Sequence, residues 1–142
     1  MSIVINLLMW LHFIGVGLAV GGGIALSQIG PRLIAAPADQ RGTWWPLETF
    51  FSRLGAGGLL VLLATGPLMA WLKFGGFSGF SHWFWAKMAL VLVAICAIGL
   101  HEWAGARFKR GDEAASSLMV IAGRVAGGAI MLVILCAVFT FN

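Results

Sequence analysis

The sequence predicts an all-α fold, an integral membrane bundle of four helices, on three observations. The chain of 142 residues is 61% hydrophobic and only 10% charged, whereas soluble domains carry about 25% charged residues. Its apolar residues gather in four runs, each close to the roughly 20 residues that a helix needs to cross a bilayer. No segment alternates apolar and polar residues as a half-buried strand does. We therefore expect a single transmembrane domain over residues 1–142 with almost no soluble part.

The four predicted spans cover residues 3–29, 53–72, 83–103 and 118–141. The start of the chain lacks the basic stretch and the small-residue cleavage pattern of a secretory signal, so we expect the first span to be retained. Short connections join the spans.

The distribution of Lys and Arg predicts the orientation, because these residues favour the cytoplasmic side in short loops. The first and third connections hold most of them, as Arg32, Arg41, Arg53, Arg107, Lys109 and Arg110. The connection over residues 74–82 contains neither Lys nor Arg inside it. Both termini are therefore expected on the periplasmic side of a bacterial cytoplasmic membrane. The net charge of +4 is too small and too dispersed to indicate a nucleic-acid partner.

The first span combines a histidine with a strip of small residues. Small side chains follow His12 at helical spacing and lie within about 80° of it around the helix; they are Gly15, Ala19, Gly22 and Gly23. One interpretation is a slot for a flat ligand beside His12. The other is close packing of helices, which small residues permit in membranes.

Ionisable side chains within spans usually face a partner or a cavity, because exposing them to lipid is costly. The candidates are His12, Arg53, Lys87, His101, Glu102 and Arg124. Lys87 and His101 are 14 positions apart, which places them on one face of the third span. On the fourth span, Arg124 shares a face with Gly127 and Gly128.

Haem b fits this arrangement better than a bare metal ion. His12 and His101 are the candidate axial ligands, since neutral imidazole commonly binds haem iron. Arg53, Arg124 and Arg32 are the candidate cofactor-binding arginines, because guanidinium groups pair with carboxylates such as propionates. A structural zinc site needs four close N or S ligands, and three distant histidines do not supply them. Copper remains an alternative cofactor, because thioethers suit Cu(I) and three methionines lie toward the outer side, Met9, Met69 and Met88.

Depth separates the two histidines. His12 is expected in the outer half of the membrane and His101 near the cytoplasmic end, about 15 Å or more apart along the normal. Each could hold its own haem, or one could be structural, with His101 and Glu102 forming a hydrogen-bonded pair. A third possibility is a haem shared by two chains. His82, in the outer connection, is a further candidate.

Other side chains have simpler interpretations. Tryptophans near the span ends are typical of the membrane interface; they are Trp44, Trp45, Trp83, Trp85 and Trp103. Cys96 and Cys136 each lie in an apolar run, where a lone cysteine is usually a packing residue.

The layout resembles that of small four-span membrane proteins related to HemJ-type protoporphyrinogen oxidase and to the CopD copper-resistance family. The similar features are Trp10-Leu11-His12, Gly30-Pro31-Arg32-Leu33, Trp85-Ala86-Lys87 and His101 at the end of the third span. The resemblance implies b-type haem and redox chemistry. For the HemJ branch it also implies oxidation of a porphyrinogen, with His12 and Lys87 as important positions and Lys87 as the candidate catalytic residue.

Two functions from different classes follow. The favoured one is a haem-binding membrane protein that transfers electrons, with a porphyrinogen or a quinol as the oxidised substrate and a redox partner or quinone. The alternative is a non-enzymatic accessory subunit of a membrane complex, or a copper-handling membrane protein. Either is expected to form a homo-oligomer, with a dimer favoured, because the glycine faces exceed what four helices use internally.

Overall fold

The computed structural model describes residues 2–75 and 82–140, so most of the middle connection lies outside the described residues. The described chain forms four helices, which are α1 (Ser2–Ala35), α2 (Arg41–Phe74), α3 (His82–Lys109) and α4 (Ala115–Thr140). Each is long and apolar enough to cross a membrane. The prediction of an all-α chain with four helices long and apolar enough to span a membrane is confirmed for the described residues.

The helices extend beyond the predicted spans. α2 begins at Arg41, well before residue 53, and α1 continues through Pro31 to Ala35. With 34 residues each, α1 and α2 are about 51 Å long, against a hydrocarbon core of about 30 Å. Hydropathy marks the part of a helix that lipid covers. The helix itself continues outside it, since its backbone hydrogen bonds are internal to the segment.

Glycines with left-handed backbone conformations follow two of the helices. Gly75 has φ of 72° and donates its backbone N–H to the carbonyl of Trp71 at 3.2 Å, which closes α2. Gly111 has φ of 97° in the connection between α3 and α4. Residues with a Cβ rarely adopt these angles, so glycine is favoured at both positions.

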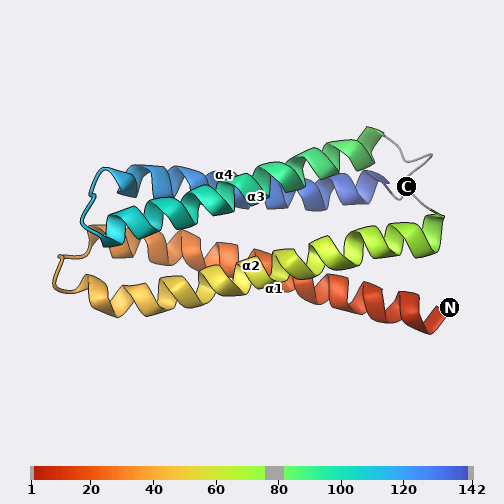
Figure 1. Cartoon of the computed structure of the whole chain (residues 1–142), viewed down its shortest axis with the longest axis horizontal. Coiled ribbons are helices and arrows are strands. Elements are labelled where there is room, and N and C mark those ends of the chain that lie inside the picture. The colour runs from red at the N-terminus through yellow and green to blue at the C-terminus, as the bar shows by residue number, and fades with distance from the viewer. Residues whose placement is uncertain (1, 76–81, 141–142) are drawn as a thin grey trace.

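The bundle consists of two helical hairpins. α1 packs along α2 and α3 packs along α4, whereas the hairpins meet less extensively, chiefly through α1 and α4. Figure 1 shows the α1–α2 and α3–α4 connections at one end of the molecule and the start of α1 and the end of α4 at the other. We call the first of these the loop end. The hairpins are thus the compact units of the fold, joined along a smaller contact.

The α1–α2 hairpin is built on glycine-to-backbone contacts. A Cβ added at Gly22 would lie 2.8 Å from the backbone N of Gly55, and one at Gly58 would lie 2.5 Å from the backbone N of Ala19. A Cβ at Gly15 would lie 3.0 Å from the carbonyl oxygen of Gly58. Most of the glycine strip below His12 is therefore filled by α2. Close helix packing therefore explains Gly15 and Gly22, whereas Ala19 and Gly23 of the same strip line a cavity described below.

An apolar core closes the loop end. It consists of Leu33, Ala104, Phe108, Ala115 and Met119, with Trp44 and Trp45 packed against it. The Trp45 and Phe108 rings lie 5.9 Å apart, within the range of favourable aromatic pairs. These two tryptophans therefore contribute to the loop-end core as well as lying near a span boundary.

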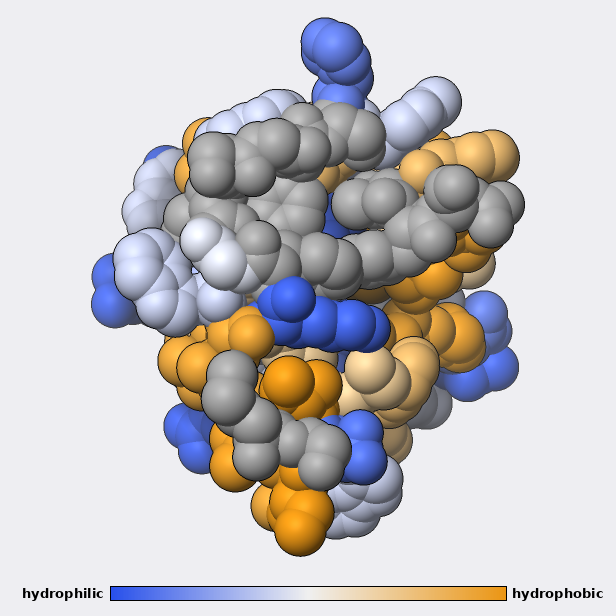
Figure 2. Space-filling view, turned by 90° about the vertical axis from the view of Figure 1, so that its right-hand side faces the viewer, coloured by the Kyte–Doolittle hydropathy of each residue, from blue (hydrophilic) through white to orange (hydrophobic). Residues whose placement is uncertain are grey.

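Large apolar side chains cover the outside of the helices. Ile24, Leu60 and Leu92, each near the middle of its helix, are more than half exposed. Figure 2 views the end opposite the loop end and shows hydrophobic residues at the surface between hydrophilic residues that lie across its middle and around its rim. An apolar exterior with polar groups held inside is what lipid as solvent requires.

Candidate functional site

A polar cluster joins α2, α3 and α4 near the loop end, with three of its four side chains buried and Glu102 exposed. We call it the His101 cluster and define it as His101, Glu48, Ser52 and Glu102. Nδ1 of His101 lies 2.9 Å from the backbone oxygen of Met119, and Nε2 lies 3.3 Å from Oε1 of Glu48. A carbonyl oxygen only accepts, so Nδ1 carries a proton and donates it to Met119.

The helices position these side chains across the gap between the hairpins. Glu48 and Ser52 are four residues apart on α2, so they lie one turn apart on the same face. The Ser52 hydroxyl donates to Oε1 of Glu102 on α3. Glu48, Ser52 and His101 are 6%, 7% and 9% exposed. Polar groups this buried stay stable only when they are hydrogen-bonded or bind an ion, and here each bonds across a helix boundary.

The cluster has the ligand atoms and spacing of a metal site. Glu48, His101 and Glu102 each offer one ligand atom, and the three atoms lie within 4.8 Å of one another. Because Nδ1 of His101 donates to a backbone carbonyl, Nε2 is the ring nitrogen left to bind a metal. Ligands held at about 2.0–2.1 Å around a tetrahedral ion lie about 3.3–3.4 Å apart. The distance of 3.3 Å from Nε2 to Glu48 Oε1 matches that spacing.

The contact between His101 and Glu48 requires either an additional proton on one of the two groups or a metal ion between them. Nε2 of a singly protonated ring and a carboxylate oxygen are both acceptors, so they repel at hydrogen-bond distance. An additional proton on either group, or a metal ion bound by both, removes the repulsion. The arrangement can therefore hold a proton or bind a metal ion inside the bundle.

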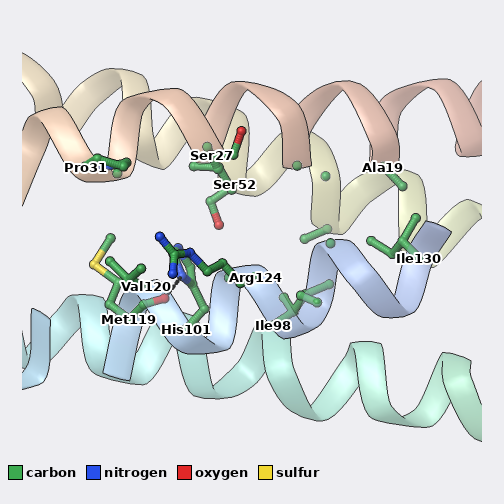
Figure 3. Close-up of a pocket in the computed structure, with 18 of the residues that line it drawn as sticks. Ala19, Ser27, Pro31, Ser52, Ile98, His101, Met119, Val120, Arg124 and Ile130 are labelled. Atoms are coloured by element: carbon green, nitrogen blue, oxygen red, sulfur yellow. Dashed lines mark hydrogen bonds between the residues drawn. The ribbon is translucent and has the colours of Figure 1, made fainter. Parts of the chain in front are cut away.

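A cavity of about 320 Å³ lies beside the cluster, between the two hairpins. We call it the inter-hairpin cavity. Its walls come from all four helices and consist mainly of small and apolar residues, among them Ala19, Gly23, Gly55, Ile98, Gly127 and Ile130. Its size is at the lower end of the roughly 300–1,000 Å³ typical of small-molecule and cofactor sites. Figure 3 shows Ser52 reaching into it from the α1–α2 side.

Arg124 lies in this cavity next to the His101 ring (Figure 3). Among the residues that the structure describes, no hydrogen bond or ion pair involves its guanidinium. Glu48 contacts His101 instead, and Glu102 accepts from Ser52. The cavity therefore contains a positive charge without a protein counter-charge in contact with it.

His12 belongs to a different level of the bundle. Its Nδ1 lies 2.8 Å from Oγ1 of Thr65, whose hydroxyl donates to the carbonyl of Val61 at 2.7 Å. Thr65 and Glu48, which contact His12 and His101, are 17 positions apart on α2, or about 25 Å. One haem iron therefore cannot bind both histidines of one chain.

The remaining predicted site residues lie apart from the cavity. Arg32 and Arg53 are exposed and do not line it. Lys87 is half-buried, with Nζ 5.2 Å from the centre of the Phe84 ring, and His82 is exposed at the start of α3. The structure thus brings His101 and Arg124 together, and it does not bring His12, Arg32, Arg53 or Lys87 to the same cavity.

The suggested hydrogen bond between His101 and Glu102 is wrong. Neighbours in a helix point about 100° apart, and the structure pairs His101 with Glu48 and Glu102 with Ser52. Sequence reasoning missed Glu48 and Ser52 because it placed them in, or at the end of, a polar connection. Their four-residue spacing inside the stretch Trp44–Ser52 is the signal that would have found them.

Comparisons with family models, curated proteins and solved structures give no match to this chain.

Proposed function

We propose that this chain is a multi-pass membrane protein that binds a first-row transition metal ion at His101, Glu48 and Glu102 and uses it in redox chemistry. One observation carries the proposal. The Met119 carbonyl holds the proton of His101 on Nδ1, and Nε2 lies 3.3 Å from a buried carboxylate oxygen.

The ligand chemistry favours iron, manganese or zinc over copper. One imidazole and two carboxylates form a nitrogen and oxygen site, whereas Cu(I) prefers thiolate and thioether ligands. Within the described part of the chain, no cysteine sulfur is among the grouped ligand atoms. The redox role rests on the resemblance to HemJ-type and CopD proteins, and it favours iron or manganese over zinc, which has no redox chemistry.

The metal content of purified protein tests this proposal. Wild-type protein in neutral detergent, loaded with Fe²⁺ or Mn²⁺ and then desalted, is expected to retain about one ion per chain by elemental analysis. His101→Ala and Glu48→Gln should lose most of it, since each removes a ligand. His12→Ala is the matched control, a histidine within a span about 25 Å away. Equal metal in His101→Ala, or no ion retained by wild type after loading, contradicts the proposal.

A second candidate is haem b in the inter-hairpin cavity. The observation that favours it is the cavity itself, with His101 and Arg124 together on one wall and glycines around them. His101 would supply the axial imidazole, and Arg124 would pair with a propionate. The residues fit in type, provided that Nε2 of His101 turns from Glu48 to the cavity. Lys87 and His12 would then contact substrate nearer the other end of the bundle.

Glu48→Gln separates the two candidates. It removes a ligand of the bare ion, but not of haem, so haem-bound protein should keep its Soret band and its resolved α band on reduction. Pyridine haemochrome analysis of wild type, Glu48→Gln and His101→Ala gives the haem content of each. If wild type from haem-replete membranes is colourless, or His101→Ala keeps the full spectrum, the haem candidate fails.

Orientation and assembly belong to the same proposal. We infer a bacterial cytoplasmic membrane with the loop end in the cytoplasm. The supporting observation is that Arg41, Arg107, Lys109 and Arg110 all lie at that end. We also expect a homodimer. With His12 and His101 at different levels, a haem shared between two chains would use the same histidine from each.

A further inference from the structure

We propose that the inter-hairpin cavity binds an amphipathic anion, an acyl chain ending in a carboxylate or a phosphate ester, with its charged group against Arg124. This inference goes beyond the metal centre and does not depend on it.

Arg124 is the first reason. It lies nine residues after the start of α4, about 14 Å along the helix, inside a segment able to span a membrane. A guanidinium at that depth is costly unless it meets a partner or a polar cavity. Its five N–H groups are all donors, and the described side chains offer it no carboxylate within ion-pair distance. An oxyanion in the cavity would satisfy both the charge and the donors.

The other polar groups of the cavity point to the same type of ligand. The Ser27 hydroxyl donates to the carbonyl of Ile24 at 2.7 Å, and the Ser52 hydroxyl donates to Glu102. The proton on Nδ1 of His101 is used by Met119. Arg124 is therefore the side chain that still has donors to offer an anion.

The rest of the wall requires an apolar body. Ile34 and Ala19 line the cavity at its two ends along α1, and the distance between them is about 22 Å. Beyond Arg124 the wall on α4 continues with Ala126, Gly127 and Ile130. A long, narrow, apolar space with one positive group fits a chain with one charged end. A bilayer supplies such molecules directly, as fatty acids or as acidic phospholipids.

Binding to the purified full-length chain tests the inference. Radiolabelled laurate is measured by equilibrium dialysis in a neutral detergent, phosphatidylglycerol by native mass spectrometry, and dodecanol serves as the uncharged match to laurate. Laurate, phosphatidylglycerol or both are expected to bind, and dodecanol at least about tenfold more weakly than laurate. Binding of laurate alone identifies a fatty acid site, and binding of phosphatidylglycerol alone identifies a phospholipid site.

Two variants locate the ligand. Arg124→Gln should weaken binding about ten- to a hundredfold, since hydrogen bonds to a charged group contribute about 1.5–3 kcal/mol. Gly127→Leu should weaken it by filling the cavity while leaving Arg124 in place. Arg53→Gln is the matched control, because Arg53 and Arg124 are both classed as exposed but Arg53 does not line the cavity. If Arg124→Gln does not fold, Arg124→Lys, which keeps the charge but loses the paired donors, should bind several-fold more weakly.

Several results would overturn the inference. They are unchanged binding in both Arg124→Gln and Gly127→Leu, equal binding of dodecanol and laurate, and no binding of either anionic probe to wild type. Purified protein with one haem in this cavity would overturn it as well, because the haem would occupy the same space and the same arginine.

Discussion

Replacing Gly58 with leucine is expected to drive α1 and α2 apart and to cause a large loss of stability. A Cβ at Gly58 would lie 2.5 Å from the backbone N of Ala19 and 2.7 Å from the carbonyl of Gly15. Both are backbone atoms of α1, so rotation of a side chain cannot relieve the clash. Overpacking typically costs about 1–3 kcal/mol, and we expect about 3 kcal/mol or more where backbone meets backbone. Unfolding in mixed micelles, followed by circular dichroism, measures it.

Gly57→Leu is the control for this prediction. Gly57 is the adjacent residue of α2, and a Cβ there would have no heavy atom within 4 Å. Both variants carry the same change of side chain and of helix propensity. A similar loss of stability in the two variants would show that α1 and α2 do not pack as the structure describes.

His101→Ala in metal-free protein is the second large effect, expected to cost about 3–5 kcal/mol. The substitution leaves Glu48, only 6% exposed, without its hydrogen-bonding partner, and it also removes the bond to the Met119 carbonyl. The cost therefore comes mainly from the orphaned carboxyl group. The measurement is the free energy of unfolding of wild type, His101→Ala, Glu48→Gln and the double variant.

The double variant should be less destabilised than the sum of the two single variants, by about 0.5–3 kcal/mol, because the two residues interact directly. His82→Ala is the control, since His82 is an exposed histidine on the same helix and should change stability by less than about 0.5 kcal/mol. Strict additivity of the two single substitutions would argue against the contact between His101 and Glu48.

Hydropathy was sufficient for the number and type of the helices but not for their ends. The lipid-sized apolar runs identify four segments, and each lies within one helix of the structure wherever it is described. The start of α2 at Arg41 was missed because residues 41–52 mix charged, aromatic and proline residues. Proline is well tolerated in the first turns of a helix, so Pro46 does not mark an end there.

Only part of the site was predicted, because the sequence shows unusual residues within a helix but not how two hairpins pack together. His101 and Arg124 were found because ionisable residues inside apolar runs stand out in any sequence. Their partner Glu48 was missed, because pairing between α2 and α3 depends on how two hairpins dock, which no local pattern records. The glycines after His12 were ambiguous, since a ligand slot and a close helix contact both favour small residues. Only the position of α2 in the structure distinguishes a ligand slot from a close helix contact.

The division of the bundle into two hairpins has a consequence for its assembly in the membrane. Each hairpin can insert and close by contacts between sequence neighbours, which makes it a natural cooperative unit. Glu48 belongs to the first hairpin and His101 to the second, so neither unit alone contains the complete cluster or the cavity. A ligand bound there would stabilise only the docked state, by RT ln(1 + [L]/Kd). Ligand binding would therefore report that the two hairpins have docked correctly.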